Sequence, residues 1–163
     1  MSPTILPAPM TDSLQLRYAP NNRCFGCGPA NEKGLRIASL VEGDKIVADW
    51  TPQKHHEAFA GVVNGGIIGT LFDCHSNWTA AYHLMQKTGA KELPSTVTSE
   101  FHVKLKRTTS STAPLRIEAR VVESSDDRAV VEAEILSGGK VTSTCRGVFV
   151  AIQEGHPAYH RWS

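Results

Sequence analysis

Residues 64–89 read NGGIIGTLFDCHSNWTAAYHLMQKTG, and this stretch decides the fold. Asn64 can cap a helix whose body runs from Gly65 to Lys87, about six turns, and Gly89 can end it. In its first half, apolar side chains occupy most of the circumference. A helix without a polar face has to be buried, so we predict a long central helix.

Six segments with alternating apolar residues flank this helix and predict strands. Two precede it, residues 35–40 and 45–50, with a hairpin turn at residues 42–44. Four follow it after Pro94, at residues 97–106, 115–122, 129–136 and 141–152. The breaks between them are spaced as hairpin connections. The predicted fold class is α+β, with a six-strand antiparallel sheet against one long helix.

One domain accounts for the chain, which has 163 residues. We place the domain at residues 23–153. Residues 1–22 contain four prolines and few large apolar groups, which predicts an irregular N-terminal arm. Residues 154–163 are expected to form a short irregular tail.

Composition excludes several classes of function. The 17 Lys and Arg residues nearly balance the 16 Asp and Glu residues, so no strong field attracts nucleic acid. No run approaches the roughly 18 apolar residues of a membrane span, and the first residues lack the basic flank of a secretion signal. We therefore expect a cytoplasmic protein with no nucleic-acid or membrane partner. Its four cysteines are expected to be free thiols.

Asp73 stands among apolar residues of the predicted helix. An ionised carboxylate there needs water or a polar partner, and Asn77, Gly69 and Thr70 lie one turn away. The alternative is that Asp73 reaches an exposed edge or pairs with a lysine.

Gly65 and Gly66 place two backbone amides without neighbouring side chains at the start of the helix. The N–H groups there are unpaired and the helix dipole is positive. Such an end can stabilise an oxyanion, although paired glycines also permit close packing of a helix on a sheet. Gly65 and Asp73 are eight residues apart, which is about 12 Å along one helix. Two chains would therefore have to share a site that uses both.

Three segments resemble the hotdog-fold acyl-CoA thioesterases, in the branch of the phenylacetate-pathway (PaaI-like) enzymes. They are CFGCGPANEKGL at residues 24–35, the pattern His-x4-Gly-Val-Val-Asn-Gly-Gly-x6-Asp at residues 56–73, and residues 98–107. The resemblance implies a sheet wrapped around the helix. It also implies a homodimer or dimer of dimers with active sites at the dimer interface, and we expect no cofactor.

The resemblance implies a role for individual residues. Gly65 corresponds to the glycine whose amide polarises the thioester carbonyl, and Asp73 to the acidic residue from the opposite protomer. Thr98 corresponds to a hydroxyl residue that positions water or the carboxylate, and Asn77 to a polar position. The further substrate-binding candidates are Asn64, Gly66, His56 and, for the phosphates of coenzyme A, Lys104, Lys106 and Arg107.

Three departures from the family pattern concern the site. Asn64 stands where many members have histidine, but asparagine can still cap the helix. Ala58 replaces an amide residue that holds water in some relatives, and His56 is the neighbour that can compensate. Leu105 and Thr108 replace a common Tyr and Pro, which alters the expected acyl pocket.

The sequence therefore predicts an acyl-CoA thioesterase that releases a free acid and coenzyme A. A thiolate leaves easily, so no serine relay is required, and no Gly-x-Ser-x-Gly elbow is present. Two alternatives keep the fold: a non-catalytic acyl-CoA or acyl-ligand binding protein, and a hydratase or dehydratase.

Cys24 and Cys27 form a Cys-x-x-Cys pair. The pair could supply half of a zinc site, with His55 and His56 as the other half. The interpretation we prefer is a tight turn shaped by glycines, with no metal.

Overall fold

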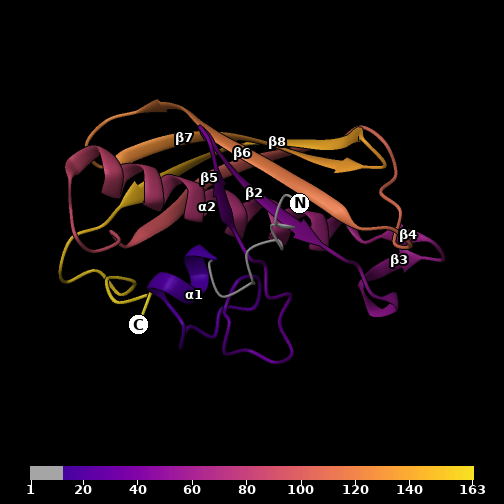
Figure 1. The fold of residues 1–163 in the computed structure, drawn as a ribbon, viewed down its shortest axis with the longest axis horizontal. Helices are drawn as coiled ribbons and strands as arrows, with labels where there is room; N and C mark the ends of the chain where they lie inside the picture. Colours follow the sequence, from indigo (N-terminus) through magenta and orange to yellow (C-terminus); the bar gives the residue numbers. More distant parts are fainter. Residues whose placement is uncertain (1–12) are drawn as a thin grey trace, which may run out of the picture.

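The computed structural model describes residues 13–163 and contains one large antiparallel sheet packed on one long helix (Figure 1). The order of strands in the sheet is β1-β2-β6-β7-β8-β5. The strands are β1 (Leu40–Glu42), β2 (Lys45–Trp50), β5 (Thr96–Leu105), β6 (Leu115–Ser124), β7 (Arg128–Ser137) and β8 (Lys140–Ala151). A small hairpin, β3 (Glu57–Phe59) and β4 (Val62–Val63), follows a 3-10 turn at Lys54–His56 and precedes the long helix.

The long helix α2 spans Gly65–Thr88, and the sheet residues that face it form the core. The Asn64 side chain caps its start, and Gly89 ends it in the left-handed region with φ 72°. Its first turns bury Ile68, Leu71 and Phe72. The predicted central helix and the α+β class with a six-strand antiparallel sheet are thus confirmed.

The strand predicted at residues 35–40 is wrong in position, because the first strand of the sheet is Leu40–Glu42. Leu35 and Ile37 are buried, as their apolar character indicated, but their N–H groups donate to the carbonyls of Phe25 and Gly26. Between them, Arg36 has a φ of 54°, which interrupts extended pairing. The segment is therefore bonded to the preceding loop and not to the sheet.

The irregular arm predicted at residues 1–22 contains a short helix, α1 (Leu14–Tyr18), capped by Ser13. Leu14 is buried in the core, and the side chain of Gln15 bonds both the hydroxyl and the N–H of Ser39. Residues 1–12 lie outside the described part of the chain. The end of the arm is therefore integrated into the domain.

The C-terminal residues 154–163 form irregular turns, as expected, but they are packed against the domain. The Trp162 ring lies 4.4 Å from the Trp78 ring of α2, and its indole N–H donates to the Pro94 carbonyl at 2.8 Å. Figure 1 shows the tail and α1 on the side of α2 away from the sheet. Within residues 13–163, no helix is both long and apolar enough to span a bilayer.

Candidate active site

The first turn of α2 has one backbone donor that its cap leaves free. The Asn64 side-chain oxygen accepts from the N–H groups of Gly66 at 2.7 Å and Ile67 at 3.3 Å. The Asn64 N–H itself donates to the His56 carbonyl at 2.9 Å. None of these bonds uses the N–H of Gly65, and Gly65 is exposed. The helix start thus offers one amide, with the dipole behind it, to an external oxygen.

One face of α2 meets the edge strand β5 through residues spaced one helical turn apart. The helix and the strand run in opposite directions, so contacts progress backwards along β5. The Leu105 side chain lies 3.5 Å from where a Cβ on Gly65 would stand, and the Phe101 ring lies 4.0 Å from the same position on Gly69. The four pairs are Gly65 with Leu105, Gly69 with Phe101, Asp73 with Thr98 and Asn77 with Thr96. The two glycines leave this face without side chains beside Asp73.

A β-bulge between Thr98 and Glu100 makes this alignment possible. Strict alternation would put Thr98 and Phe101 on opposite faces, because they are three residues apart. The extra residue in the bulge returns both to the helix side. His102 and Lys104 consequently lie on the other face of the sheet.

Asp73 is half-buried, and its carboxylate accepts a hydrogen bond of 2.6 Å from the Thr98 hydroxyl. Burial and the charge of Asp73 raise the pKa of the Cys145 thiol to about 12. Cys145 therefore stays protonated and is a poor nucleophile at neutral pH. The carboxylate is the reactive group that this part of the helix presents.

The partners predicted for Asp73 from helical spacing were wrong. Thr70 donates to the Gly66 carbonyl at 3.0 Å. Asn77 is buried, and its amide exchanges hydrogen bonds of 2.6 and 3.3 Å with Thr96. Asn77 therefore fixes β5 to the helix and is not available to a substrate. The partner of Asp73 comes from the strand.

His56 lies near the helix start but its ring is buried. The ring packs 4.9 Å from the Trp50 ring, and Nδ1 accepts from the Gln53 N–H at 2.9 Å. Burial lowers the pKa of His56, so the ring is neutral at pH 7. Its carbonyl, which accepts from Asn64, holds the start of α2 in place. The structure thus gives His56 a supporting contact instead of the expected contact with water, and Ala58 beside it is exposed.

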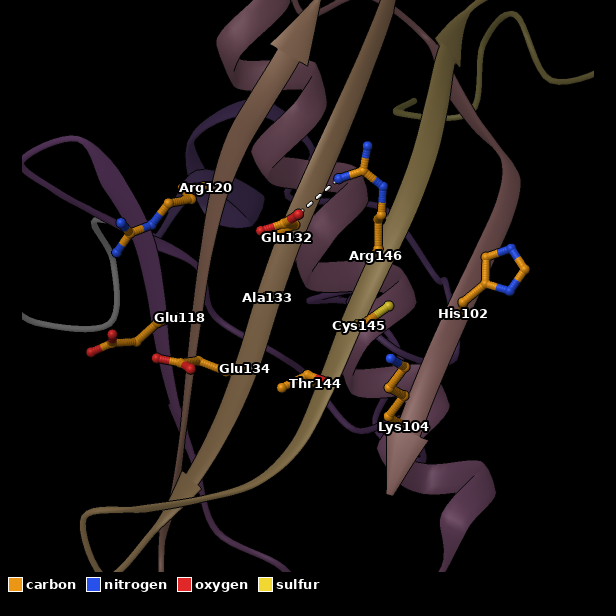
Figure 2. A pocket seen from close by; sticks show the side chains of 10 residues that line it. All are labelled: His102, Lys104, Glu118, Arg120, Glu132, Ala133, Glu134, Thr144, Cys145 and Arg146. Carbon is orange, nitrogen blue, oxygen red and sulfur yellow. Dashed lines mark hydrogen bonds and ion pairs between the residues drawn. The ribbon is translucent and has the colours of Figure 1, made fainter. Parts of the chain in front are cut away.

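The three basic residues proposed for coenzyme A do not line one common hollow. Lys104 lines a shallow hollow on the face opposite α2, where charges of both signs gather (Figure 2). Charges in that hollow are partly paired, as Arg146 contacts Glu132 at 2.7 Å. Lys106 and Arg107 follow the end of β5 and line a different surface hollow with Lys140. Lys106 directly follows Leu105, whose side chain lies against Gly65 at the start of α2.

Cys24 and Cys27 do not meet the two histidines proposed as zinc ligands. Their third partner is Cys74 of α2, and the sulfurs of all three lie within 4.8 Å of one another. Hydrogen bonds from the Cys27 and Cys74 thiols lower the pKa of Cys24. The hydrogen bond to Cys24 raises the pKa of Cys27 to about 12.

Sequence reasoning missed Phe101 and the contact of Cys74 with the other two cysteines, and it treated Gly69 only as a neighbour of Asp73. Gly65, Gly69 and Asp73 are spaced by four residues, so they lie on one face of the helix. This spacing could have predicted a face with two positions that lack side chains and one carboxylate. The position of Phe101 depends on the bulge, which no residue pattern of the strand indicates.

Comparisons with known proteins agree with this architecture. Residues 60–144, more than half of the chain, match the model of the thioesterase superfamily, and the chain therefore belongs to that family. No curated protein matches.

Solved structures share the fold at low sequence identity. A thioesterase superfamily protein from Shewanella loihica PV-4 is 24% identical with a TM-score of 0.61, and the match covers 77% of this chain and 98% of that one. A phenylacetic acid degradation-related protein from Ralstonia eutropha JMP134 is 17% identical with a TM-score of 0.60, over 72% and 86% of the two chains. A protein from Pseudomonas aeruginosa is 21% identical with a TM-score of 0.60, over 72% and 90%.

Proposed function

We propose that this protein is an acyl-CoA thioesterase that works as a homodimer with a site shared between protomers. The observation that carries the proposal is the arrangement on one face of α2. Asp73 is held by Thr98 beside a strip of glycines, two turns from the unused N–H of Gly65. The Gly65 amide binds the carbonyl oxygen, and Asp73 of the partner protomer attacks the thioester or activates water.

Two protomers are required because Gly65 and Asp73 are too far apart on one helix, at about 12 Å. Gly69 lies midway between them, one turn from each. A two-fold axis at the level of Gly69 and its neighbour Phe101 would bring Gly65 of one protomer to the level of Asp73 of the other. Both shared sites then form together, as an isologous dimer requires.

The edge strand β5 supports this assembly. It is ten residues long, and its outer side has no neighbour within the described sheet. Phe101 is 40% exposed and Leu105 is 59% exposed. A long edge with exposed apolar residues invites pairing with another strand. Pairing of β5 with its copy would cover Phe101 at the axis and extend the sheet to twelve strands.

The chemistry needs few groups. A thiolate leaves without strong acid assistance, since a thiol has a pKa of about 8.5. Stabilisation of the tetrahedral oxygen by one positioned donor contributes about 2.7–4 kcal/mol, and the Gly65 amide is such a donor. Asp73 supplies the nucleophile or the general base.

The coenzyme A assignment rests on positive charge near the helix start. Lys106, Arg107 and Lys140 line one surface hollow next to the end of β5. The phosphates of coenzyme A are polyanionic, and clustered Lys and Arg side chains bind such groups. Lys104 is not included in this assignment, because it lies on the far face of the sheet.

The test is thiol release from a panel of acyl-CoA esters that differ in chain length and aromaticity. We expect Asp73→Asn to lose at least 100-fold in kcat while it keeps the fold and the dimer. Asp49→Asn is the matched control, since Asp49 is an exposed strand residue with only a 3.8 Å contact to Arg116. Saturable acyl-CoA binding by the wild type without thiol release would instead select the non-catalytic alternative. Full activity of Asp73→Asn would remove Asp73 from the mechanism.

A further inference from the structure

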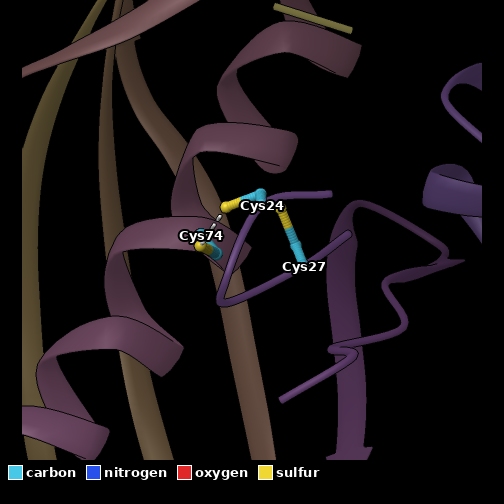
Figure 3. Close-up of side chains that lie close together, drawn as sticks. All are labelled: Cys24, Cys27 and Cys74. Carbon is cyan, nitrogen blue, oxygen red and sulfur yellow. Dashed lines mark hydrogen bonds between the residues drawn. The ribbon is translucent and has the colours of Figure 1, made fainter. Parts of the chain in front are cut away.

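Three cysteines from two separate segments meet against the helix α2 (Figure 3). Cys24 and Cys27 come from the loop that precedes the sheet, and Cys74 comes from α2, directly after Asp73. The sulfurs of Cys24 and Cys74 are 3.8 Å apart, and all three lie within 4.8 Å of one another. Zn²⁺ bound by thiolates at about 2.3 Å in tetrahedral geometry places sulfurs about 3.8 Å apart. The cluster therefore has the dimensions of a thiolate metal site.

The loop is held tightly against the helix at this point. A Cβ on Gly26 would lie 2.3 Å from the Cys74 sulfur and 2.9 Å from a Thr70 methyl group, so only glycine permits this approach. The N–H of Gly28 donates to the Cys24 carbonyl at 2.9 Å and closes the turn. The Cys-x-x-Cys spacing thus fixes two sulfurs on one side of a rigid turn, opposite the third.

One N–H donor points at a sulfur of the cluster, an arrangement that suits a thiolate ligand. The indole N–H of Trp78 points at the Cys27 sulfur at 3.3 Å. Such donors stabilise negative charge on metal-bound sulfur and orient the ligand.

We propose that Cys24, Cys27 and Cys74 bind one Zn²⁺ ion per chain as thiolates, with water in the fourth position. Each thiol loses its proton to solvent when the metal binds. We assign water to the fourth coordination position because Cys24 is only half-buried and solvent can reach the ion there. Cys27 and Cys74 are buried. The ion would connect the loop to the turn of α2 that carries Asp73. Soft thiolate ligands select Zn²⁺ over Mg²⁺ or Ca²⁺.

The experiment measures metal content directly, so it does not depend on thioesterase activity. The full chain is produced in zinc-supplemented medium, purified under reducing conditions and analysed by inductively coupled plasma mass spectrometry. We expect about one zinc per chain in the wild type and in Asp73→Asn. Cys24→Ser and Cys74→Ser should each lower the zinc content at least ten-fold. Cys145→Ser is the matched control, because Cys145 is buried outside the cluster, and it should keep its zinc.

A second measurement uses only the wild-type protein, so it tests the proposal even if a cysteine variant fails to fold. Co²⁺ added to the metal-free wild-type protein should give thiolate-to-metal charge-transfer absorption and the intense visible bands of tetrahedral Co²⁺. Wild-type protein with reduced thiols, no zinc and no such absorption would overturn the proposal. Zinc retained in both Cys24→Ser and Cys74→Ser, or a Cys24–Cys27 disulfide in protein that takes up no metal, would overturn it as well.

Discussion

The hydrogen bond from Thr98 to Asp73 provides a graded test of how the carboxylate is used. Thr98→Val keeps the size and β-branching of the side chain but removes the hydroxyl that donates to Asp73 at 2.6 Å. Hydrogen bonds to charged groups contribute about 1.5–3 kcal/mol. One factor of ten in rate corresponds to about 1.4 kcal/mol. If the bond holds the carboxylate in its reactive geometry, kcat should fall about 10- to 150-fold.

Thr98 is a positioning residue in this account, so the expected effect is specific. KM should change little, because the hydroxyl serves the carboxylate and not the bound substrate. Thr98→Ser should restore most of kcat, since serine supplies the same donor. Thr144→Val, on the opposite face of the sheet, is the matched control and should be fully active. Steady-state thiol release and thermal melts are measured for the wild type, for these three variants and for Asp73→Asn. The two measurements separate an effect on catalysis from an effect on stability. Wild-type kcat in Thr98→Val, with Asp73→Asn inactive, would refute the reasoning.

Three further predictions concern assembly and stability. Phe101→Glu places a charge at the proposed axis and should shift the protein from dimer to monomer in sedimentation experiments, with loss of activity at both sites. Burial lowers the pKa of His75 to about 4 from the ordinary 6.5, so its contribution to stability, complete above pH 6.5, is lost as pH falls towards 4. Denaturant titrations should show that this residue accounts for a loss of about 3 kcal/mol in unfolding free energy between pH 6.5 and pH 4. In His75→Gln, this part of the pH dependence should be absent. Trp162→Ala should cost about 3 kcal/mol of unfolding free energy, because the ring is buried against Trp78.

The central helix was predictable because local signals agree with its burial. Asn64 and Gly89 mark its ends, and the apolar residues between them leave no polar face. The segment at residues 35–40 has equally suitable apolar spacing, but Arg36 takes a positive φ and the N–H groups beside it bond the loop before it. Hydrophobic periodicity reports which side chains are buried. It does not report which backbone supplies the hydrogen bonds.

The candidate site was predictable where a residue acts through its position on the helix. Gly65 and Asp73 needed only helical geometry, and their separation predicted a shared site. The strand side depended on the bulge between Thr98 and Glu100, which single-sequence alternation does not reveal. Because of this bulge, Phe101 faces the helix and Lys104 faces away. Strand residues after the bulge could therefore not be assigned to a face of the sheet by counting from Thr98.

The asparagine at the helix start also explains how the site can tolerate a departure from the family pattern. Its side chain accepts from Gly66 and Ile67, the second and third N–H groups of the helix, and it leaves the first. A cap that bonded the Gly65 N–H would occupy the donor that the proposed chemistry uses. Without any cap, the first turn would fray. Asn64 avoids both outcomes, since its side-chain oxygen caps only Gly66 and Ile67. The His56 carbonyl holds the Asn64 N–H. Asparagine in place of the family's histidine therefore preserves the Gly65 N–H as a free donor. The helix sets the direction of this N–H, and the side chain at position 64 does not.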